Sequence, residues 1–463
     1  MDDEVQNSRN ETAPPDKIAD KGIFGEDDIV IPSPTDYDEE SPVDERGVRK
    51  LTAFQRFSRF VSDDIVGGFI LIIAAVLALF FANGPFREGY HALATTVLDP
   101  GFQEATAQGA KSFLQSIHLS LTVEEWARDG ILAIFFFTVG LELKEEFTHG
   151  SLRDPRTAGM PIIAAVFGMA GPAAVYLAVT GLAGVEAWHG WAIPTATDIA
   201  FAVAILQIFG RGLPSGARTF LLTLAVADDL GGIIVIALFY GSQPNLLLLI
   251  PVALGAALFS FLCRKRWVKW WLLIPIGVVV WYFMHASGIH ATIAGVVLGM
   301  VVPSDKREGE VHNLVEHLSM KVSPISAAFA VPIFAFFAAG VNIVDTPGGV
   351  IKMLTNPVAL AVMLALPLGK LLGISGSVFV MEKFTPLHLE KGVKLGDVIP
   401  ISFVAGIGFT VALLISHLAF QGNDVLTQAG SIGVVMGTLL SIILGALALK
   451  ARTSYRKSHD SMQ

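Results

Sequence analysis

Long apolar segments separated by short charged loops constrain this chain more than any other feature of its sequence. The first, Ile65 to Phe86, has 22 residues without a charge, and a helix needs about 20 residues to cross a bilayer. Eleven more follow, at about residues 130–143, 158–182, 188–210, 217–240, 245–263, 268–285, 289–303, 325–344, 356–381, 398–420 and 429–449. No run of short alternating segments favours a membrane β-barrel. We therefore expect an all-α polytopic membrane protein with twelve transmembrane helices.

Composition excludes several other classes of protein. The chain is 53% hydrophobic and 16% charged, against about 25% charged for an average soluble chain. Its net charge of -9 comes from the first 50 residues, and the remainder is neutral, so nucleic acid is not an expected partner. A single cysteine, Cys263, rules out an intramolecular disulfide and a multi-cysteine metal site. We expect no cofactor.

The segments outside the apolar runs divide the chain into a core and two tails. Residues 1–55 are acidic and poor in aromatic side chains, a composition typical of disorder. They do not resemble a signal peptide, because the leading region is acidic. The core is expected at 56–450 and a second tail at 451–463. Within the core, residues 84–126 form the longest loop, and its alternation at 117–123 fits either a small hairpin or an ordered loop on the helix bundle.

The distribution of lysine and arginine predicts the orientation in the membrane. An even number of spans places both termini on one side, and basic residues favour the cytoplasmic loops. Counting from a cytoplasmic N-terminus, 24 lysines and arginines flank the inside of the spans. Only four lie outside, namely Arg87, Lys111, Arg128 and Lys352. We therefore expect cytoplasmic termini.

Four ionisable residues lie within the apolar segments: Asp198, the adjacent Asp228 and Asp229, and Lys370. A charge at mid-membrane costs about 2.5–3.5 kcal/mol on insertion scales, so it indicates a partner or a function. A buried ion pair that only holds helices together is the alternative, but two adjacent acids exceed one lysine. A cation or protons must therefore supply the balance. Because neighbouring helical residues point about 100° apart, one carboxylate is expected to bind a hard cation and the other to meet Lys370.

Two apolar segments are interrupted. One reads Ala192-Ile-Pro-Thr-Ala-Thr-Asp198 and the other Ala405-Gly-Ile-Gly-Phe-Thr410. Either interruption alone also fits a proline kink or a glycine packing face. Each lies in the middle of a three-span block, and the two blocks start from opposite sides, a pattern that indicates a transporter with a site at mid-membrane. Asp198 and Lys370 are expected to compensate the dipoles of the half-helix ends.

Several motifs, in one order over about residues 55–450, resemble the NhaA-type Na⁺/H⁺ antiporters. They are Ser62-Asp-Asp-Ile-Val-Gly-Gly, Ile70-Leu-Ile-Ile-Ala-Ala, Val139-Gly-Leu-Glu-Leu-Lys144, Ala196-Thr-Asp-Ile-Ala-Phe201, Ala227-Asp-Asp-Leu-Gly231, Ser287-Gly-Ile-His-Ala-Thr-Ile-Ala-Gly295, Gly369-Lys370 and Gly406-Ile-Gly-Phe-Thr410. Paired broken helices are known in this family.

The resemblance implies roles for individual residues. Asp229 would be the main carboxylate for cation and proton, and Asp228 would alternate between Lys370 and the site. Thr197 and Asp198 would lie at the crossing of the broken helices, and Thr197 would bind the cation together with Asp228 and Asp229. Three residues would modulate the response to pH, namely Glu142, Glu146 and His290. Glu142 also fits a helix-end carboxylate paired with Lys144, and His290 a buried, hydrogen-bonded histidine.

The resemblance also implies an activity. The chain would be an electrogenic Na⁺ (or Li⁺)/H⁺ antiporter of the cell inner membrane, serving Na⁺ and pH homeostasis. It would be a secondary transporter and not an enzyme, in contact with membrane lipid and monovalent cations, with residues 84–126 as the candidate surface for a homodimer. A symporter for an organic solute would need a larger polar cavity, and a channel would need a repeated filter.

Two features depart from the family pattern. Phe336-Phe-Ala-Ala-Gly-Val341 lacks an asparagine that the family commonly has in the ninth span. The spacing from Glu316-His317 to Pro332 is longer than expected, so a role in pH sensing is not carried over to these two residues.

Overall fold

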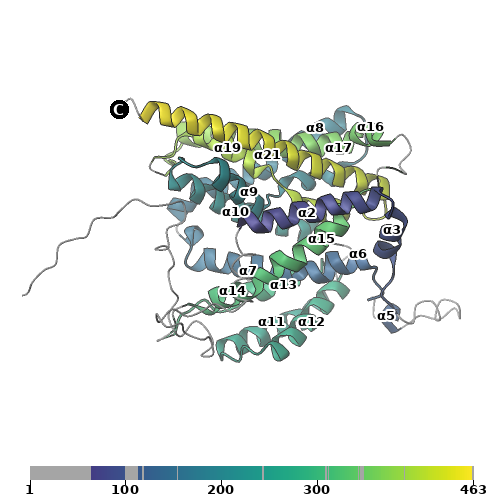
Figure 1. Cartoon of the computed structure of the whole chain (residues 1–463). Coiled ribbons are helices and arrows are strands. Elements are labelled where there is room, and N and C mark those ends of the chain that lie inside the picture. Colours follow the sequence, from purple (N-terminus) through teal and green to yellow (C-terminus); the bar gives the residue numbers. More distant parts are fainter. Residues whose placement is uncertain are drawn as a thin grey trace, which may run out of the picture. The chain divides into compact units, whose positions relative to one another are not determined.

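In the computed structural model, the regular secondary structure of the described residues is helical, and turns and short irregular segments connect the helices (Figure 1). The structure describes residues 64–99, 113–116, 119–153, 155–241, 245–307, 310, 312–342, 344, 349–390 and 392–460. The chain divides into two units, 1–50 and 51–463, and all the described residues belong to the second. The acidic tail predicted at 1–55 lies outside the described residues. Two isolated bridges and no strand occur in the described part, so the expected all-helical membrane protein is confirmed.

Among the residues that the structure describes, seven helices are long and apolar enough to cross a membrane, judged by length and composition. Four of them fall on single helices, namely α2 (Asp64–Asn83), α8 (Pro155–Leu182), α10 (Ser215–Phe239) and α21 (Asp424–Asp460). The other three join consecutive helical elements, namely η5 and α11 (Leu246–Arg264), α14 to α15 (Leu314–Ala338) and α17 to α18 (Pro357–Phe384). Helices α2, α11 and α12 (Trp270–Ala286) each expose several large apolar side chains. Such exposed apolar surface is typical of helices that face lipid.

Two further candidate spans are broken. The short helix η4 (Trp188–Thr195) and α9 (Ile199–Phe209) meet at 44°, and α19 (Leu395–Ala405) and α20 (Phe409–Ala419) meet at 52°. Counting each pair as one span gives up to nine candidates in the described part. Both breaks fall in the two segments whose proline and glycines interrupt the apolar pattern.

The other expected spans are shorter as regular helices. α7 (Leu132–Thr148) and α12 have 17 residues each, and α13 (Ile293–Met300) has eight. The count of twelve therefore stays a prediction. One boundary was wrong: the helix expected at 325–344 runs from Leu314 to Ala338. Asn313 caps it by accepting from the Glu316 amide at 2.8 Å, a polar start that the hydropathy pattern did not reveal.

The long loop at 84–126 contains helix α3 (Arg87–Thr95), a turn of helix at α5 (Phe113–Ser116) and the three-residue α6 (Val123–Glu125). Within the loop, an antiparallel bridge joins Val97 to Thr122. Residues 100–112 lie outside the described part, so the hairpin and the ordered loop both stay open as predictions.

Glycines allow α8 to approach the helix that carries Lys370. A Cβ atom at Gly171 would overlap the carbonyl of Gly369, and one at Gly373 would overlap the carbonyl of Phe167. Small residues that let helix backbones touch are typical of membrane helix packing. This contact holds the segment around Lys370 directly against α8.

Candidate functional site

The two breaks lie against each other. The backbone amide of Asp198, in the first break, donates to the carbonyl of Ile407, in the second, over 2.5 Å. A Cβ atom at Gly408 would lie 2.8 Å from the carbonyl oxygen of Ala196, and one at Gly406 would lie 2.6 Å from that of Leu366. Only glycine leaves room for the extended backbones to approach so closely. The interrupted segments therefore cross inside the protein.

Asp198 caps both half-helices that begin at this crossing. Its Oδ1 accepts from the amide of Phe201 in α9 at 3.3 Å. Its Oδ2 accepts from the amide and hydroxyl of Thr410 in α20, at 3.3 and 2.8 Å. The side chain is buried. One carboxylate therefore meets the positive ends of two helix dipoles.

Lys370 lies where the opposite helix ends approach. Its Nζ donates to the carbonyl of Thr195, the last residue of η4, over 2.5 Å, and to Oγ1 of Thr197 over 3.0 Å. It also forms an ion pair with Asp228, and both side chains have 0% exposure. Two π-helical turns flank it, η7 (Ala365–Gly369) and η8 (Leu371–Ser375). Such turns inside membrane helices frequently mark functional sites.

Thr197 links Asp228 to the second broken segment. Its Oγ1 lies 2.6 Å from Asp228 Oδ2 and 2.8 Å from the carbonyl oxygen of Ala405, the last residue of α19. A hydroxyl has one proton, so Thr197 can donate to only one of these acceptors at a time. If Asp228 moves or gains a proton, the hydrogen bond between Thr197 and the carbonyl at the end of α19 therefore changes too.

The adjacent carboxylates on α10 each keep one oxygen without a protein partner. Oδ1 of Asp228 and Oδ1 of Asp229 are buried and make no hydrogen bond to any residue that the structure describes, although buried polar atoms are nearly always paired. The largest charge effects on Asp229 come from the carboxylates of Asp228, Asp198 and Glu142 and from Lys370, so acids outnumber the lysine among them. Two unpartnered carboxylate oxygens suit a hard monovalent cation or a proton. Within the described residues, no group of three or more His, Cys, Asp or Glu could hold a metal ion.

Of the three residues expected to modulate the pH response, Glu142 and Glu146 lie four residues apart on α7, and His290 lies on another segment. Glu142 is exposed on α7 and is among the charges acting on Asp229. The carboxylate of Glu146 lies beside Gly150, after the C-terminal end of α7. His290 precedes α13, and its Nδ1 lies 3.9 Å from Asp129 Oδ1 without a hydrogen bond. The charge of Glu142 thus acts on a carboxylate of α10.

A family model described as Na⁺/H⁺ antiporter 1 matches residues 58–449. The chain belongs to this family. Its relatives include a Na(+)/H(+) antiporter NhaA 2 from Kineococcus radiotolerans, 44% identical over 443 residues that cover 93% of each chain. A second is the Na(+)/H(+) antiporter NhaA 1 from Salinispora tropica, 47% identical over 406 residues that cover 86% of this chain and 90% of the relative. The resemblance seen in the motifs is confirmed.

Membership in the Na⁺/H⁺ antiporter family, together with the apolar helices, establishes an integral membrane protein of a transporter family. The sequence analysis missed Thr410 as the second ligand of the Asp198 carboxylate. The sequence feature that indicates this contact is a residue with a hydroxyl group, Thr410, two positions after Gly408, where the second half-helix begins. It also missed Asp397, which is fully buried and bound by Arg452 and Arg456 from the end of α21, because those partners are 55 and 59 residues away.

Proposed function

We propose that this protein exchanges Na⁺ or Li⁺ for protons across the cell inner membrane. The observation that carries the proposal is the pair of buried, unpartnered oxygens on Asp228 and Asp229, beside a lysine that neutralises only one of them. An uncompensated buried carboxylate must bind a proton or a cation to stay in a low dielectric. The relatives named above are called Na(+)/H(+) antiporters, which supports these two ions as the alternatives.

Competition for the same carboxylates explains the exchange. Asp229 binds either a proton or the cation. When the cation arrives, Asp228 turns from Lys370 to share it, and the Thr197 hydroxyl can then donate to Ala405 alone. This step links occupancy of the site to the ends of both broken helices, because Lys370 also holds the carbonyl of Thr195.

The charges of Asp198 and Lys370 also stabilise the helix ends that meet at the crossing. Asp198 compensates the positive N-terminal ends of α9 and α20, and Lys370 compensates the negative ends of η4 and α19. The contacts of Asp198 with Thr410 and of Lys370 with Thr195 support this role.

The number of protons per cation determines whether exchange carries charge. We propose that more than one proton leaves when one monovalent ion binds, from both aspartates or from one aspartate and Lys370. Net positive charge then moves inward in each cycle, and an inside-negative membrane potential would drive Na⁺ out. Such a transporter would serve Na⁺ and pH homeostasis.

The number of membrane spans and their orientation are proposed from the sequence. Twelve spans with cytoplasmic termini agree with the distribution of basic residues, and the three-span blocks around the breaks have inverted topology. Glu142, Glu146 and His290 would modulate the response to pH. Membrane lipid surrounds the bundle, residues 84–126 would form the contact of a homodimer, and no cofactor takes part.

The experiment is Na⁺-dependent proton release from purified protein in lipid vesicles, with Asp229→Asn beside the wild type. The amide keeps the shape of the side chain but cannot exchange a proton, so we expect release to vanish while the protein still inserts and purifies. Substantial Na⁺-driven proton movement in Asp229→Asn would exclude Asp229 as the carrier. Uptake of Na⁺ together with an organic solute, without proton release, would instead support a symporter.

A further inference from the structure

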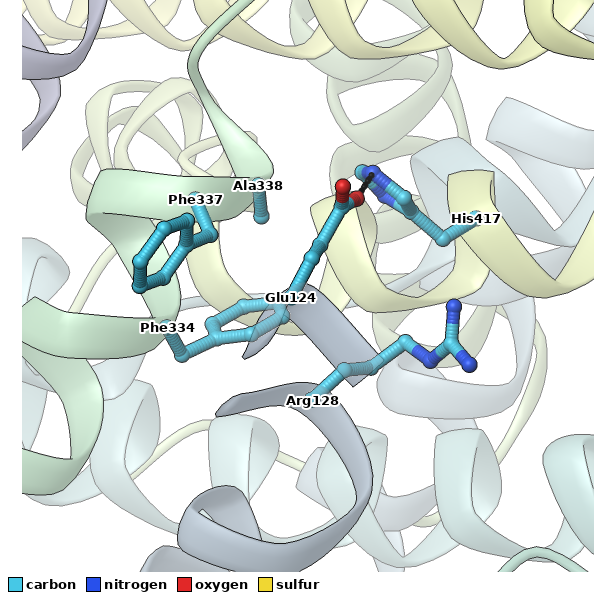
Figure 2. Close-up of a pocket in the computed structure, with 6 residues that line it drawn as sticks. All are labelled: Glu124, Arg128, Phe334, Phe337, Ala338 and His417. Atoms are coloured by element: carbon cyan, nitrogen blue, oxygen red, sulfur yellow. Dashed lines mark ion pairs between the residues drawn. The ribbon is translucent and has the colours of Figure 1, made fainter. Parts of the chain in front are cut away.

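A half-buried ion pair lies at the far end of α20 from the crossing. Nε2 of His417 lies 3.3 Å from Oε1 of Glu124 in α6, and Figure 2 shows the carboxylate directed at the imidazole ring. The His417 side chain is only 12% exposed. Since α20 begins beside Thr410, which binds Asp198, one helix of 11 residues connects this pair to the candidate cation site.

The geometry of the ring shows that this contact needs a proton. Nδ1 of His417 lies 2.9 Å from the carbonyl oxygen of Leu413. A carbonyl can only accept, so Nδ1 carries a hydrogen. In the neutral ring, Nε2 would then present a lone pair to the carboxylate, and the two would repel. The contact is attractive only when a further proton makes the ring an imidazolium or makes Glu124 an acid.

The proton belongs on the histidine. Burial raises the pKa of Glu124, but the hydrogen bond and charge of His417, with the charges of Arg128 and His91, lower that pKa below its ordinary value overall. Glu124 is therefore ionised at neutral pH. The further proton that the contact needs is therefore carried by Nε2 of His417.

The surroundings of the pair contain few competing charges. Arg128 is held by Asp129 at 3.0 Å, and Glu125 is engaged in the capping box with Thr122. From α3, Tyr90 donates to a backbone carbonyl, whereas His91 Nε2 has no partner in the described part. The face of α15 in the pocket is apolar, with Phe334, Phe337 and Ala338 (Figure 2). His189 of η4 and Asp424 of α21 are the titratable groups on the near ends of the other helices packed on α20. Neither bonds to His417 in the described part of the chain.

We propose that His417 and Glu124 form a proton-binding site, separate from the carboxylates of α10, in which a bound proton holds α20 against α6 and slows exchange. In the orientation proposed above this site faces the outside of the cell. Alternating access in transporters with broken helices requires one group of helices to move against another, and a closed pair ties α20 to the segment that precedes α7. The effect on transport rests on the proposed function, but the proton-binding site itself does not.

The first test measures coupling between the two residues without transport. Unfolding midpoints of the purified wild type, His417→Ala, Glu124→Ala and the double variant form a double-mutant cycle. We expect coupling at pH 5.5 and none at pH 8, because only the protonated ring attracts the carboxylate. The same cycle with His189 in place of His417 is the control and should show no such change, because His189 is not among the charges that act on Glu124. Equal coupling between His417 and Glu124 at both pH values would overturn the proposal.

The second test measures Na⁺ efflux from right-side-out vesicles at fixed inside pH and zero potential. His417→Gln keeps an N–H directed at Glu124 at every pH, whereas His417→Ala never forms the contact. Relative to wild type at the same pH, we expect His417→Ala to be about equal at outside pH 8 and about tenfold faster at pH 5.5, the range over which most imidazoles gain a proton. His417→Gln should be about tenfold slower at pH 8 and equal at pH 5.5. His189→Gln is the matched control.

The outcomes separate the two proposals. Variant-to-wild-type ratios that stay the same at both outside pH values would exclude a role for this site in transport. Proton-dependent coupling in a protein whose wild type moves no Na⁺ would contradict the proposed function and leave the proton-binding site standing.

Discussion

Thr410 donates a hydrogen bond of 2.8 Å to the carboxylate of Asp198, although 212 residues separate them in the chain. The same carboxylate caps its own helix through the amide of Phe201. A single charged side chain therefore joins the first turns of two half-helices that begin inside the protein, where water cannot satisfy their free amides.

Replacing Asp198 by alanine removes both caps and the charge between the two helix ends. An N-cap contributes about 1 kcal/mol, so we expect a loss of about 2 kcal/mol in the free energy of unfolding. Thr410→Val removes only one hydroxyl and should lose less than half as much. Thermal unfolding in detergent, followed by tryptophan fluorescence, measures both. Equal midpoints for Asp198→Ala and wild type would show that the capping contacts do not stabilise the crossing.

Replacing Lys370 by alanine leaves the Asp228 carboxylate buried without its counter-charge. The ionised carboxylate loses its main partner, so a higher pH is needed to remove its proton. We expect the onset of exchange to move to higher pH and the unfolding midpoint to fall. Lys370→Arg, which keeps a positive charge, should shift the onset less than alanine. A pH profile and an unfolding midpoint of Lys370→Ala that both equal those of wild type would contradict the pairing.

Exchange should respond to voltage at equal pH on both sides. If more than one proton moves per cation, an inside-negative potential contributes about 2.3 kcal/mol per net charge per 100 mV toward Na⁺ export. Vesicles loaded with potassium and treated with valinomycin set this potential, and Na⁺ efflux is followed as it is varied. Efflux that does not change with the potential would mean that one proton is exchanged for one cation.

Two glycines in the segment after Lys370 provide a matched pair of substitutions. A Cβ atom at Gly373 would overlap the carbonyl of Phe167 in α8, whereas one at Gly376 meets no atom within 4 Å. We expect Gly373→Ala to displace the segment that carries Lys370 and to reduce exchange at least tenfold. Gly376→Ala should keep wild-type exchange and, because alanine favours helix, be as stable or more so by up to about 1 kcal/mol. Similar exchange rates for the two variants would show that close packing on α8 does not position Lys370.

Apolar segment length and the positions of Asp198, Asp228, Asp229 and Lys370 were enough to predict a helical membrane protein and its candidate site residues. A run of about 20 uncharged residues has few alternatives to a membrane helix, and a charge within such a run demands a partner. Both are local properties, visible without a fold. Proline and glycine likewise predicted the two breaks, because they act on the backbone at their own positions.

Only the tertiary structure decided which groups meet. Asp228 and Asp229 are neighbours in sequence, but the structure pairs Lys370 with the first and leaves an oxygen of each unpartnered. The contacts of Asp198 with Thr410 and of Glu124 with His417 join residues hundreds of positions apart. Such pairings depend on how helices pack against one another, and the periodicity of a single segment carries no information about the side chains that face it from another.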